Sequence, residues 1–398
     1  MCALTDIKPC AEVYFDNSAT TPLTEAALTQ MEQLMHSSYG NPSSLHACGL
    51  LAEKAVRTAR EQIMRVLGVR RCGAFDPVLF TAGGTEANNL ALFGTAHAKA
   101  QYRNGQILIS DSEHPSVLRC AQALEKEGIR VCRVPTRAGR LDLDAFSAYM
   151  TRQTFLVSIM TVNNETGAIY PVAEAAKIAK RINPDVIIHT DAVQAFGRLP
   201  VLPEQYGIDL VSVSAHKIGG PKGVGALYVS PAVHKSKKLT PLIFGGGQEQ
   251  GYRSGTENVI GIVGFGAAAA SLSQQRSPQA EIRAYLCEQL RVQKRFADIV
   301  INEAPQGCRA PHILSLTLPG IRSETMLHFL SARGICISAG SACASASRHI
   351  SAALAGFGLS AAQAACTIRL SFGFENTLVQ AERFLDAFAD GLAQLVRS

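Results

Sequence analysis

The sequence contains no apolar segment long enough to cross a membrane. Its longest weakly polar run, around Gly261 to Leu272, is much shorter than the roughly 18–20 apolar residues that a membrane-spanning helix requires. The first fifteen residues include Asp6, Lys8 and Glu12, where a secretory signal would need an unbroken apolar stretch. We therefore expect a cytoplasmic protein with no membrane segment.

Paired cysteines and a strong excess of one charge are also absent. The eleven cysteines are odd in number, and none forms a Cys-x-x-Cys pair, so neither a zinc knuckle nor a disulfide framework is favoured. Ten of them are expected to be small buried hydrophobic side chains. The net charge of +6 over 398 residues argues against a dedicated nucleic-acid binder and leaves room for an acidic protein partner.

The remaining composition is that of a large α/β protein. Hydrophobic residues make up 47% and charged residues 18% of a chain long enough for two domains. Apolar runs separated by helical patterns predict a mostly parallel, doubly wound sheet. The strands are expected at 78–81, 107–110, 155–160, 186–190, 210–214 and 224–229, with helices such as 51–67 and 85–100 between them. After residue 258, sparser strands at 312–318 and 366–372 and a last helix at 377–396 indicate a smaller α+β domain.

Polar residues follow several of these strands, where ligands bind in such sheets. Gly84 opens a helix after a glycine-rich turn, which suits an anion such as phosphate, although a plain strand-to-helix turn has the same pattern. His114 is fixed by the proline that follows it, and a structural role is equally open for it. Asp191 ends a buried strand and needs a cationic partner. Lys217 ends another strand, where a desolvated neutral amine can form a Schiff base.

Together these loops describe the binding site of pyridoxal 5'-phosphate. Asp191 would face the ring nitrogen and Lys217 would reach the aldehyde. The phosphate would meet Gly84, Thr85, Ser214 and His216, the ring would stack on His114, and the ring hydroxyl would meet Gln194 or Asn164.

The sequence resembles cysteine desulfurases of the NifS/IscS type, within the class V aminotransferase superfamily. The motifs that carry the resemblance run nearly from end to end: Phe15-Asp-Asn-Ser-Ala-Thr-Thr-Pro22, Tyr39-Gly-Asn-Pro-Ser-Ser-Leu-His46, Gly84-Thr-Glu-Ala-Asn-Asn89, Glu113-His-Pro115, Asn163-Asn-Glu-Thr-Gly167, Thr190-Asp-Ala-Val-Gln194, Ser214-Ala-His-Lys217, Gly245-Gly-Gly-Gln-Glu249, Arg253-Ser-Gly-Thr-Glu-Asn258, Ser338-Ala-Gly-Ser-Ala-Cys343 and Arg369-Leu-Ser371.

The resemblance implies a fold, which is that of the pyridoxal-phosphate-dependent transferases of fold type I, similar to aspartate aminotransferase. A large α/β domain, residues 16–258, would hold the cofactor on a mostly parallel seven-stranded sheet. A smaller α+β domain would combine residues 1–15 with 259–398. It would carry a mobile active-site loop at about 338–347, around Cys343.

The resemblance also assigns the site residues. It implies a sulfurtransferase that converts L-cysteine to L-alanine and holds the sulfur as a persulfide on Cys343. The sulfur would then pass to an acceptor protein, either an iron–sulfur scaffold or a thiolation enzyme. It implies a homodimer and no metal, apart from transient ligation of an iron–sulfur cluster by Cys343. In this scheme the catalytic residues are Cys343, Lys217 and His114. The substrate carboxylate is held by Arg369 with Asn41. The residues that hold the cofactor are Gly84, Thr85, Asn164, Asp191, Gln194, Ser214, His216 and Lys217, with Thr256 of a second subunit.

Two other readings remain open from the sequence. A selenocysteine lyase or a cysteine-sulfinate desulfinase of the same fold would keep its activity without Cys343, because selenium and sulfinate leave without help from a protein thiol. A catalytically idle member of the family would serve as a dimeric binding or regulatory partner and would lack bound cofactor. The presence of both Lys217 and Cys343 speaks against the idle form.

Overall fold

The computed structural model of the chain describes residues 13–37, 39–98, 105–272, 277–339 and 350–396. These residues form two compact units, which are described separately. Unit 1 takes the described residues of 1–19, 164–168 and 276–398, and unit 2 takes those of 20–163 and 169–275. The predicted domain limits at residues 15/16 and 258/259 remain predictions.

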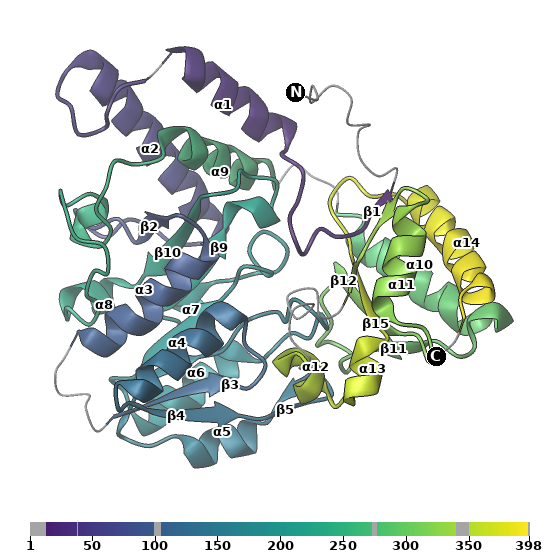
Figure 1. The fold of residues 1–398 in the computed structure, drawn as a ribbon. Helices are drawn as coiled ribbons and strands as arrows, with labels where there is room; N and C mark the ends of the chain where they lie inside the picture. Colours follow the sequence, from purple (N-terminus) through teal and green to yellow (C-terminus); the bar gives the residue numbers. More distant parts are fainter. Residues whose placement is uncertain (1–12, 38, 99–104, 273–276, 340–349, 397–398) are drawn as a thin grey trace. The chain divides into compact units, whose positions relative to one another are not determined.

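Unit 2 is built on a seven-stranded sheet with helices on both of its faces (Figure 1). The strand order is β2-β10-β9-β8-β7-β3-β4. The pairs among β9, β8, β7, β3 and β4 are parallel, and only the two pairs made by β10 are antiparallel. The predicted mostly parallel seven-stranded sheet is therefore confirmed. Its strands are β2 Val78–Thr81, β3 Gln106–Ser110, β4 Arg130–Val134, β7 Thr154–Ser158, β8 Ile187–Asp191, β9 Leu210–Ser214 and β10 Gly225–Val229, and a hairpin of β5 Thr136–Arg137 and β6 Arg140–Leu141 follows β4.

All the strands of this sheet except the edge strand β4 are buried along their whole length, as expected for strands covered on both faces. One polar residue, His189 of β8, lies in the middle of the sheet. Its Nδ1 is 2.8 Å from Ser158 Oγ on β7, and its Nε2 is 2.9 Å from Ser212 Oγ on β9. Burial lowers the pKa of His189 to about 3, so this imidazole stays neutral and cross-links three strands.

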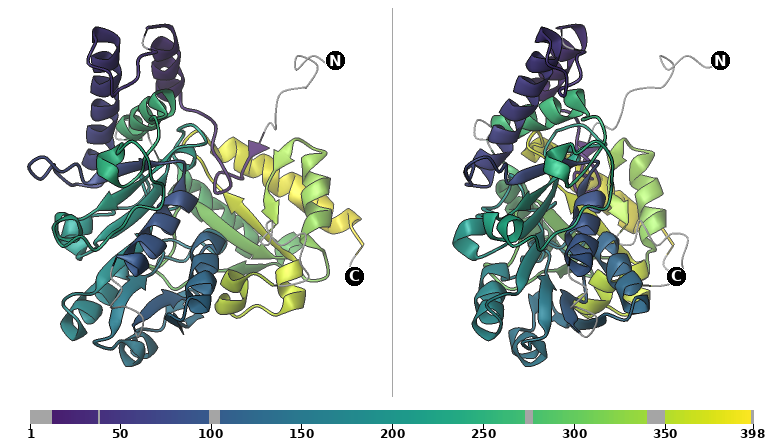
Figure 2. Two further views of the ribbon diagram at one scale, coloured as in Figure 1. Left: turned by 60° about the vertical axis from the view of Figure 1, so that its left-hand side comes forward. Right: turned by 90° about the vertical axis from the view of Figure 1, so that its left-hand side faces the viewer.

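Nine helices lie among the described residues of unit 2. Figure 2 shows α1 and α2 projecting at one end of the unit, and α9 packs against both of them. The close packing depends on small residues, because a Cβ on Gly264 of α9 would lie 2.5 Å from Met31 Sδ of α1. The helices are α1 Glu25–Ser37, α2 Ala47–Val66, α3 Gly84–His97, α4 Pro115–Lys126, α5 Leu143–Tyr149, α6 Val172–Ile182, α7 Pro203–Tyr206, α8 Pro231–Lys235 and α9 Val259–Ser271.

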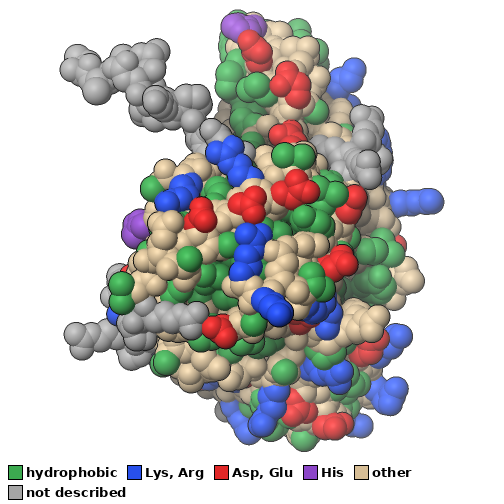
Figure 3. Space-filling model, turned by 90° about the vertical axis from the view of Figure 1, so that its right-hand side faces the viewer, with side chains coloured by type: hydrophobic (Ala, Val, Ile, Leu, Met, Phe, Trp, Pro, Cys, Tyr) green, Lys and Arg blue, Asp and Glu red, His purple; other side chains and the backbone are tan. Residues whose placement is uncertain are grey.

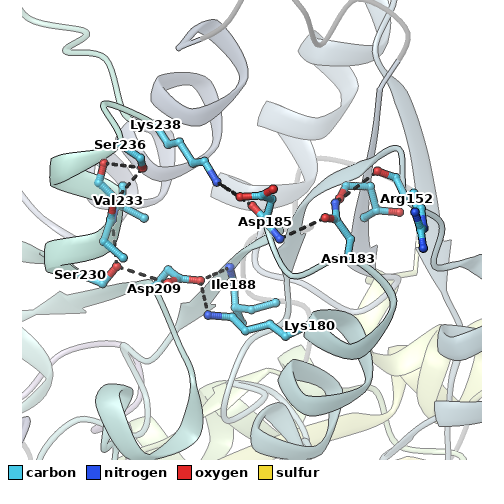
Figure 4. Close-up of polar contacts among 12 residues, drawn as sticks. Arg152, Lys180, Asn183, Asp185, Ile188, Asp209, Ser230, Val233, Ser236 and Lys238 are labelled. Carbon is cyan, nitrogen blue, oxygen red and sulfur yellow. Dashed lines mark hydrogen bonds and ion pairs between the residues drawn. The ribbon is translucent and has the colours of Figure 1, made fainter.

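Ion pairs and hydrogen bonds fix the amino-terminal end of β8, the end opposite the predicted site (Figure 4). Asp209 Oδ2 accepts a hydrogen bond from the Ile188 N–H at 3.0 Å and pairs with Lys180 Nζ at 3.0 Å. Lys238 Nζ lies 2.9 Å from Asp185 Oδ1 in the turn that precedes the strand. This network anchors the strand whose other end carries Asp191.

Unit 1 contains a four-stranded antiparallel sheet in the order β11-β12-β15-β14 and a separate parallel pair, β1 with β13. The predicted strands near 312–318 and 366–372 and the predicted last helix are all present. The strands are β1 Val13–Tyr14, β11 Val300–Asn302, β12 Ile313–Thr317, β13 Ile335–Cys336, β14 Ser338–Ala339 and β15 Thr367–Ser371, and the helices are α10 Gln279–Val292, α11 Ser323–Ser331, α12 Ala352–Phe357, α13 Ala361–Ala365 and α14 Leu378–Gln394. Phe15 and Phe372 meet edge to face in its core, with ring centroids 5.2 Å apart.

Basic and acidic side chains are interspersed on the face drawn in Figure 3. In unit 1, Glu303 pairs with the three arginines Arg283, Arg291 and Arg309. Among the residues that the structure describes, no helix has the length and apolar character needed to cross a membrane. The same residues contain no group of three or more His, Cys, Asp or Glu side chains that could hold a metal ion.

The expectation that ten cysteines are buried hydrophobes was wrong. Of the eight described cysteines, only Cys120 and Cys287 are buried, and Cys72 is exposed in a turn near the start of β2. Burial follows the position of each residue in a strand, helix or turn, and the residue type alone does not determine it. Cys336 lies on β13 and is half-buried.

Candidate cofactor site

The amino-terminal end of α3 lies beside the carboxyl end of β9. The residue that caps α3, Gly83, has no side chain to cap the N–H groups of the first turn. A Cβ on Gly84 would lie 2.7 Å from Val193 Cγ2 and 3.6 Å from Ser214 Cβ, so the close approach requires glycine. The N–H groups and the positive dipole end of a 14-residue helix suit an anion here, with Thr85 exposed in the first turn.

The turn that carries Lys217 is braced by a distant part of the same unit. It is a short 3-10 helix, Ala215–Lys217, directly after β9. The Thr21 N–H and Oγ1–H both donate to the His216 carbonyl, at 2.9 and 3.0 Å, and Thr21 Oγ1 accepts from the Gly219 N–H at 2.8 Å. The half-buried Lys217 therefore extends from a backbone that is held on both sides.

His216, which precedes the lysine, is held as a neutral ring. Its Nδ1 lies 3.2 Å from Thr20 Oγ1. Burial lowers the pKa of His216 to about 4, and the charges of Lys217 and Lys222 add to the effect. At neutral pH this imidazole can donate one hydrogen bond to an anion without carrying a charge of its own.

Asp191 is oriented by two N–H donors. Its Oδ1 accepts from the Val193 N–H at 3.0 Å, and its Oδ2 accepts from Asn88 Nδ2 at 2.7 Å. Only 5% of the residue is exposed. A buried carboxylate held in this way presents a fixed negative charge to a nearby cation.

His114 lies in the same neighbourhood as Asp191 and Lys217. Burial lowers the pKa of His114, the charge of Asp191 opposes that shift, and the charge of Lys217 reinforces it. Both charges therefore act on the imidazole. The structure thus brings together in unit 2 the histidine, aspartate and lysine that the sequence analysis singled out.

Gln194 is also buried in this unit, with 5% of its surface exposed. Its Oε1 accepts from Arg198 Nη1 at 3.4 Å. The Arg198 guanidinium is itself buried, and burial lowers its pKa to about 10. The amide nitrogen of Gln194 is consequently directed away from the arginine.

The loop that carries Thr256 is tied to the first turn of α3. Arg253 Nε donates to Glu86 Oε1 at 3.0 Å, and Glu86 Oε2 accepts from the Ala82 N–H at 2.9 Å. Thr256 itself is exposed on unit 2. Its predicted contact with the phosphate bound by a second subunit stays a prediction.

Arg369 and Asn164 meet in unit 1. Arg369 Nη1 donates to the Asn164 carbonyl at 2.9 Å, and Nη2 donates to Asp16 Oδ1 at 2.8 Å. Arg369 as a whole is 7% exposed, and its Nε is buried without a hydrogen-bond partner. Beside it, burial raises the pKa of Glu165 to about 7, a hydrogen bond from Ser351 and the charge of Arg369 opposing the shift.

Asn41 is exposed in unit 2, where its Oδ1 accepts from the Ser43 N–H at 2.9 Å. Cys343 lies outside the described residues, as does most of the loop predicted at about 338–347. The contact of Asn164 or Gln194 with a ring hydroxyl stays a prediction.

The sequence analysis missed three residues of the site. Asn88, Ser116 and Glu113 are all buried polar residues close to His114 or Asp191. The sequence carries no local signal for Asn88, because this residue lies in the polar first part of α3, between Glu86 and Asn89. Ser116 follows His114 by two residues, a spacing at which a helix-capping side chain meets the backbone.

Comparison with known proteins gives the family. The model of the aminotransferase class-V family matches residues 13–384. A cysteine desulfurase IscS from Dictyoglomus turgidum is 38% identical over 371 residues, covering 92% of this chain and 91% of that protein. A cysteine desulfurase from Sinorhizobium fredii is 40% identical over 380 residues, covering 94% of each.

Solved structures agree with these relatives. A NifS-like protein has a TM-score of 0.86 at 34% identity and covers 96% of this chain and 100% of its own. The protein SspA in complex with cysteine has a TM-score of 0.77 at 32% identity, with 92% and 100% covered. The matches support desulfurase activity rather than the lyase and desulfinase alternatives. The chain therefore belongs to the aminotransferase class-V family, as one of its cysteine desulfurases of the NifS/IscS type.

Proposed function

We propose that unit 2 binds pyridoxal 5'-phosphate at the residues described above. The proposal rests on three groups that the fold holds in fixed positions. The uncapped helix end at Gly84 suits an anion, the buried carboxylate of Asp191 suits a cation, and Lys217 supplies an amine. When bound, the cofactor supplies an electron sink for a substrate amino acid.

Each residue then has a defined task. Lys217 Nζ would hold the cofactor covalently and would carry protons at the site, and Asp191 would supply the negative charge that keeps the ring nitrogen protonated. His114 would pack against the ring, and Gln194 or Asn164 would meet its hydroxyl. The phosphate would be held by the start of α3 at Gly84 and Thr85, with Ser214 and His216, and by Thr256 of a second subunit.

The substrate is L-cysteine, whose carboxylate is taken by Arg369 with Asn41. A planar guanidinium recognises a carboxylate through two parallel hydrogen bonds. Arg369 is already oriented by Asp16 and by the Asn164 carbonyl, so little side-chain entropy is lost when it binds. The structure of the relative SspA in complex with cysteine supports this choice of substrate.

Cys343 accepts the sulfur. Its thiolate attacks the substrate sulfur, the substrate Cβ–S bond breaks, and an S–S bond forms on Cys343. The electron pair of the broken bond remains with the amino acid, which takes up a proton and leaves as L-alanine. In the balanced reaction, L-cysteine and the enzyme thiol give L-alanine and the enzyme persulfide. The outer sulfur of the persulfide then passes to an iron–sulfur scaffold or a thiolation enzyme.

The working form is a cytoplasmic homodimer. Large apolar side chains are exposed on unit 2, among them Tyr39 at 89%, Leu45 at 92% and Phe244 at 80%. An exposed apolar surface of this kind is typical of a protein interface. A second copy over this surface is consistent with an exposed Thr256, which completes the site of its partner.

The observation that carries the proposal is that hydrogen bonds through Ser116 and Asn88 connect His114 to Asp191, while the charge of Lys217 also acts on His114. The test compares the Cys343→Ala and Lys217→Ala variants in an assay of L-alanine and of sulfide released by reductant. The Cys343→Ala protein should keep the visible absorption of the bound cofactor and lose desulfuration. Borohydride should attach the cofactor covalently to the wild-type protein. It should not attach the cofactor to the Lys217→Ala protein. Cysteine turnover by Cys343→Ala at the wild-type rate would contradict the mechanism.

A further inference from the structure

An unbroken series of hydrogen bonds connects His114 to Asp191 through two residues that have no assigned role. His114 Nδ1 lies 2.8 Å from Ser116 Oγ. Asn88 Nδ2 donates to Ser116 Oγ at 2.8 Å and to Asp191 Oδ2 at 2.7 Å. Asn88 and Ser116 are 1% and 8% exposed, so water is not a ready substitute for these bonds.

The direction of each bond follows from its ends. The ionised carboxylate of Asp191 only accepts, so the group of Asn88 that faces it must be the amide nitrogen. The second hydrogen of that nitrogen is donated to Ser116 Oγ. The hydroxyl hydrogen of Ser116 is then available to His114 Nδ1.

The backbone requires the same direction. His114 is the N-cap of α4, and its Nδ1 accepts the Ser116 N–H at 3.2 Å. A proton on Nδ1 would face that N–H and remove the cap. A ring protonated on both nitrogens would also put a positive charge at the positive end of a 12-residue helix.

We propose that Asn88 and Ser116 are positioning residues that fix His114 as a neutral imidazole with its proton on Nε2, and that link this tautomer to the ionised state of Asp191. Only the catalytic consequence of this tautomer rests on the proposed function. His114 presents an N–H donor through Nε2 and has its basic nitrogen already in use, which leaves Lys217 as the proton acceptor of the site.

The charged groups around the imidazole come from every element packed near it. Asp191 of β8 favours a protonated ring, whereas Lys217 and the burial of the ring oppose it, and the burial is the larger effect. Glu113, the neighbouring residue, is buried with a pKa raised to about 8, so it adds little negative charge at neutral pH. The surroundings agree with a neutral ring.

The experiment determines the tautomer directly. The holoenzyme is labelled with ¹⁵N in its histidines, and long-range ¹H–¹⁵N correlation spectra report which ring nitrogen carries the proton. The His114 signal is assigned by its loss in His114→Gln. We expect the wild-type ring to be neutral with the proton on Nε2. Ser116→Ala and Asn88→Ala should each shift the spectrum toward an exchanging or protonated ring, and the double variant should go no further than either alone.

Two variants serve as controls. Ser116→Thr keeps the hydroxyl and should restore the wild-type spectrum. Asn89→Ala changes the neighbouring residue on α3, whose side chain bonds the Thr85 carbonyl in an exposed position, and should leave the spectrum unchanged. In turnover assays Ser116→Ala should lower kcat by about 2- to 10-fold, the effect of losing one ordinary hydrogen bond.

Two results would overturn the proposal. One is a wild-type ring that carries its proton on Nδ1 or on both nitrogens at neutral pH. The other is a Ser116→Ala spectrum identical to that of the wild type. Neither result depends on cysteine as the substrate, so a failure of this inference is distinguishable from a failure of the proposed function.

Discussion

Replacing Glu113 by glutamine should change how the stability of the protein depends on pH. Glu113 is 3% exposed, and its Oε1 accepts from Ser110 Oγ at 2.5 Å and from the Met160 N–H at 2.8 Å. Burial raises the pKa of this carboxyl to about 8, and the nearby charge of Asp191 adds to the rise, while the two hydrogen bonds oppose it. Glutamine has the same shape and keeps the accepting oxygen, but it cannot ionise.

The free-energy cost of ionising Glu113 in the folded protein follows from its raised pKa. The pKa rises from 4.5 to about 8, or 3.5 units, and each unit corresponds to about 1.4 kcal/mol, so ionisation of the buried group costs about 5 kcal/mol. Because the pKa is raised, the folded protein holds a proton that the unfolded chain releases. The contribution is fully present below pH 4.5 and is lost as the pH rises through about 8. Glu113→Gln should lack this loss and exceed the wild type in stability at alkaline pH.

Urea unfolding of the two holoproteins between pH 5 and pH 9 tests this reasoning. The difference between their midpoints should be small at pH 5 and should grow in favour of Glu113→Gln as the pH rises. Glu125→Gln is a matched control on α4, because Glu125 is exposed and paired with Arg133 at 2.7 Å. Parallel midpoint curves for the wild type and Glu113→Gln would refute the assigned ionisation.

Two other substitutions test the assigned site residues. Asp191→Asn removes the negative charge that faces the proposed ring nitrogen but keeps the acceptor for the Val193 N–H. We expect weaker retention of the cofactor and altered visible absorption, measured during dialysis, whereas unchanged absorption and affinity would argue against the pairing. Arg369→Lys replaces a planar fork by a point charge, and the loss of one charge-assisted hydrogen bond of about 1.5–3 kcal/mol should lower kcat/KM for L-cysteine by roughly 10- to 100-fold. An effect on folding without an effect on kcat/KM would assign Arg369 a structural role through Asp16.

The sheet was predictable from the sequence because most of its strands are continuous apolar runs. β4 was not predicted, since Arg130 and Arg133 are exposed on this edge strand and interrupt its hydrophobic pattern. Edge strands are commonly protected by charged side chains in this way. The same physical reason that makes β4 a safe edge therefore removes its signal from the sequence.

The positions of Asp191 at the end of β8 and of Lys217 in the turn after β9 were predictable, because both strands are apolar runs. The residues that orient them were not predictable, because they come from other parts of the chain. Asn88 is 103 residues from Asp191 in the sequence. Contacts of this range depend on the packing of α3 against the sheet, which no local pattern reports.

The bonds from Thr21 to the Lys217 turn also set an order of events during synthesis. Thr21 and His216 are 195 residues apart in the chain. At a ribosomal rate of about 5–20 residues per second, Thr21 is made about 10 to 40 seconds before its partner exists. The early segment has to wait for β9 to be synthesised, so the lysine turn is completed only after the chain has been made as far as Gly219. A nascent chain that is released before this point would lack the hydrogen bonds from Thr21. Its Lys217 would therefore not be positioned to bind the proposed cofactor.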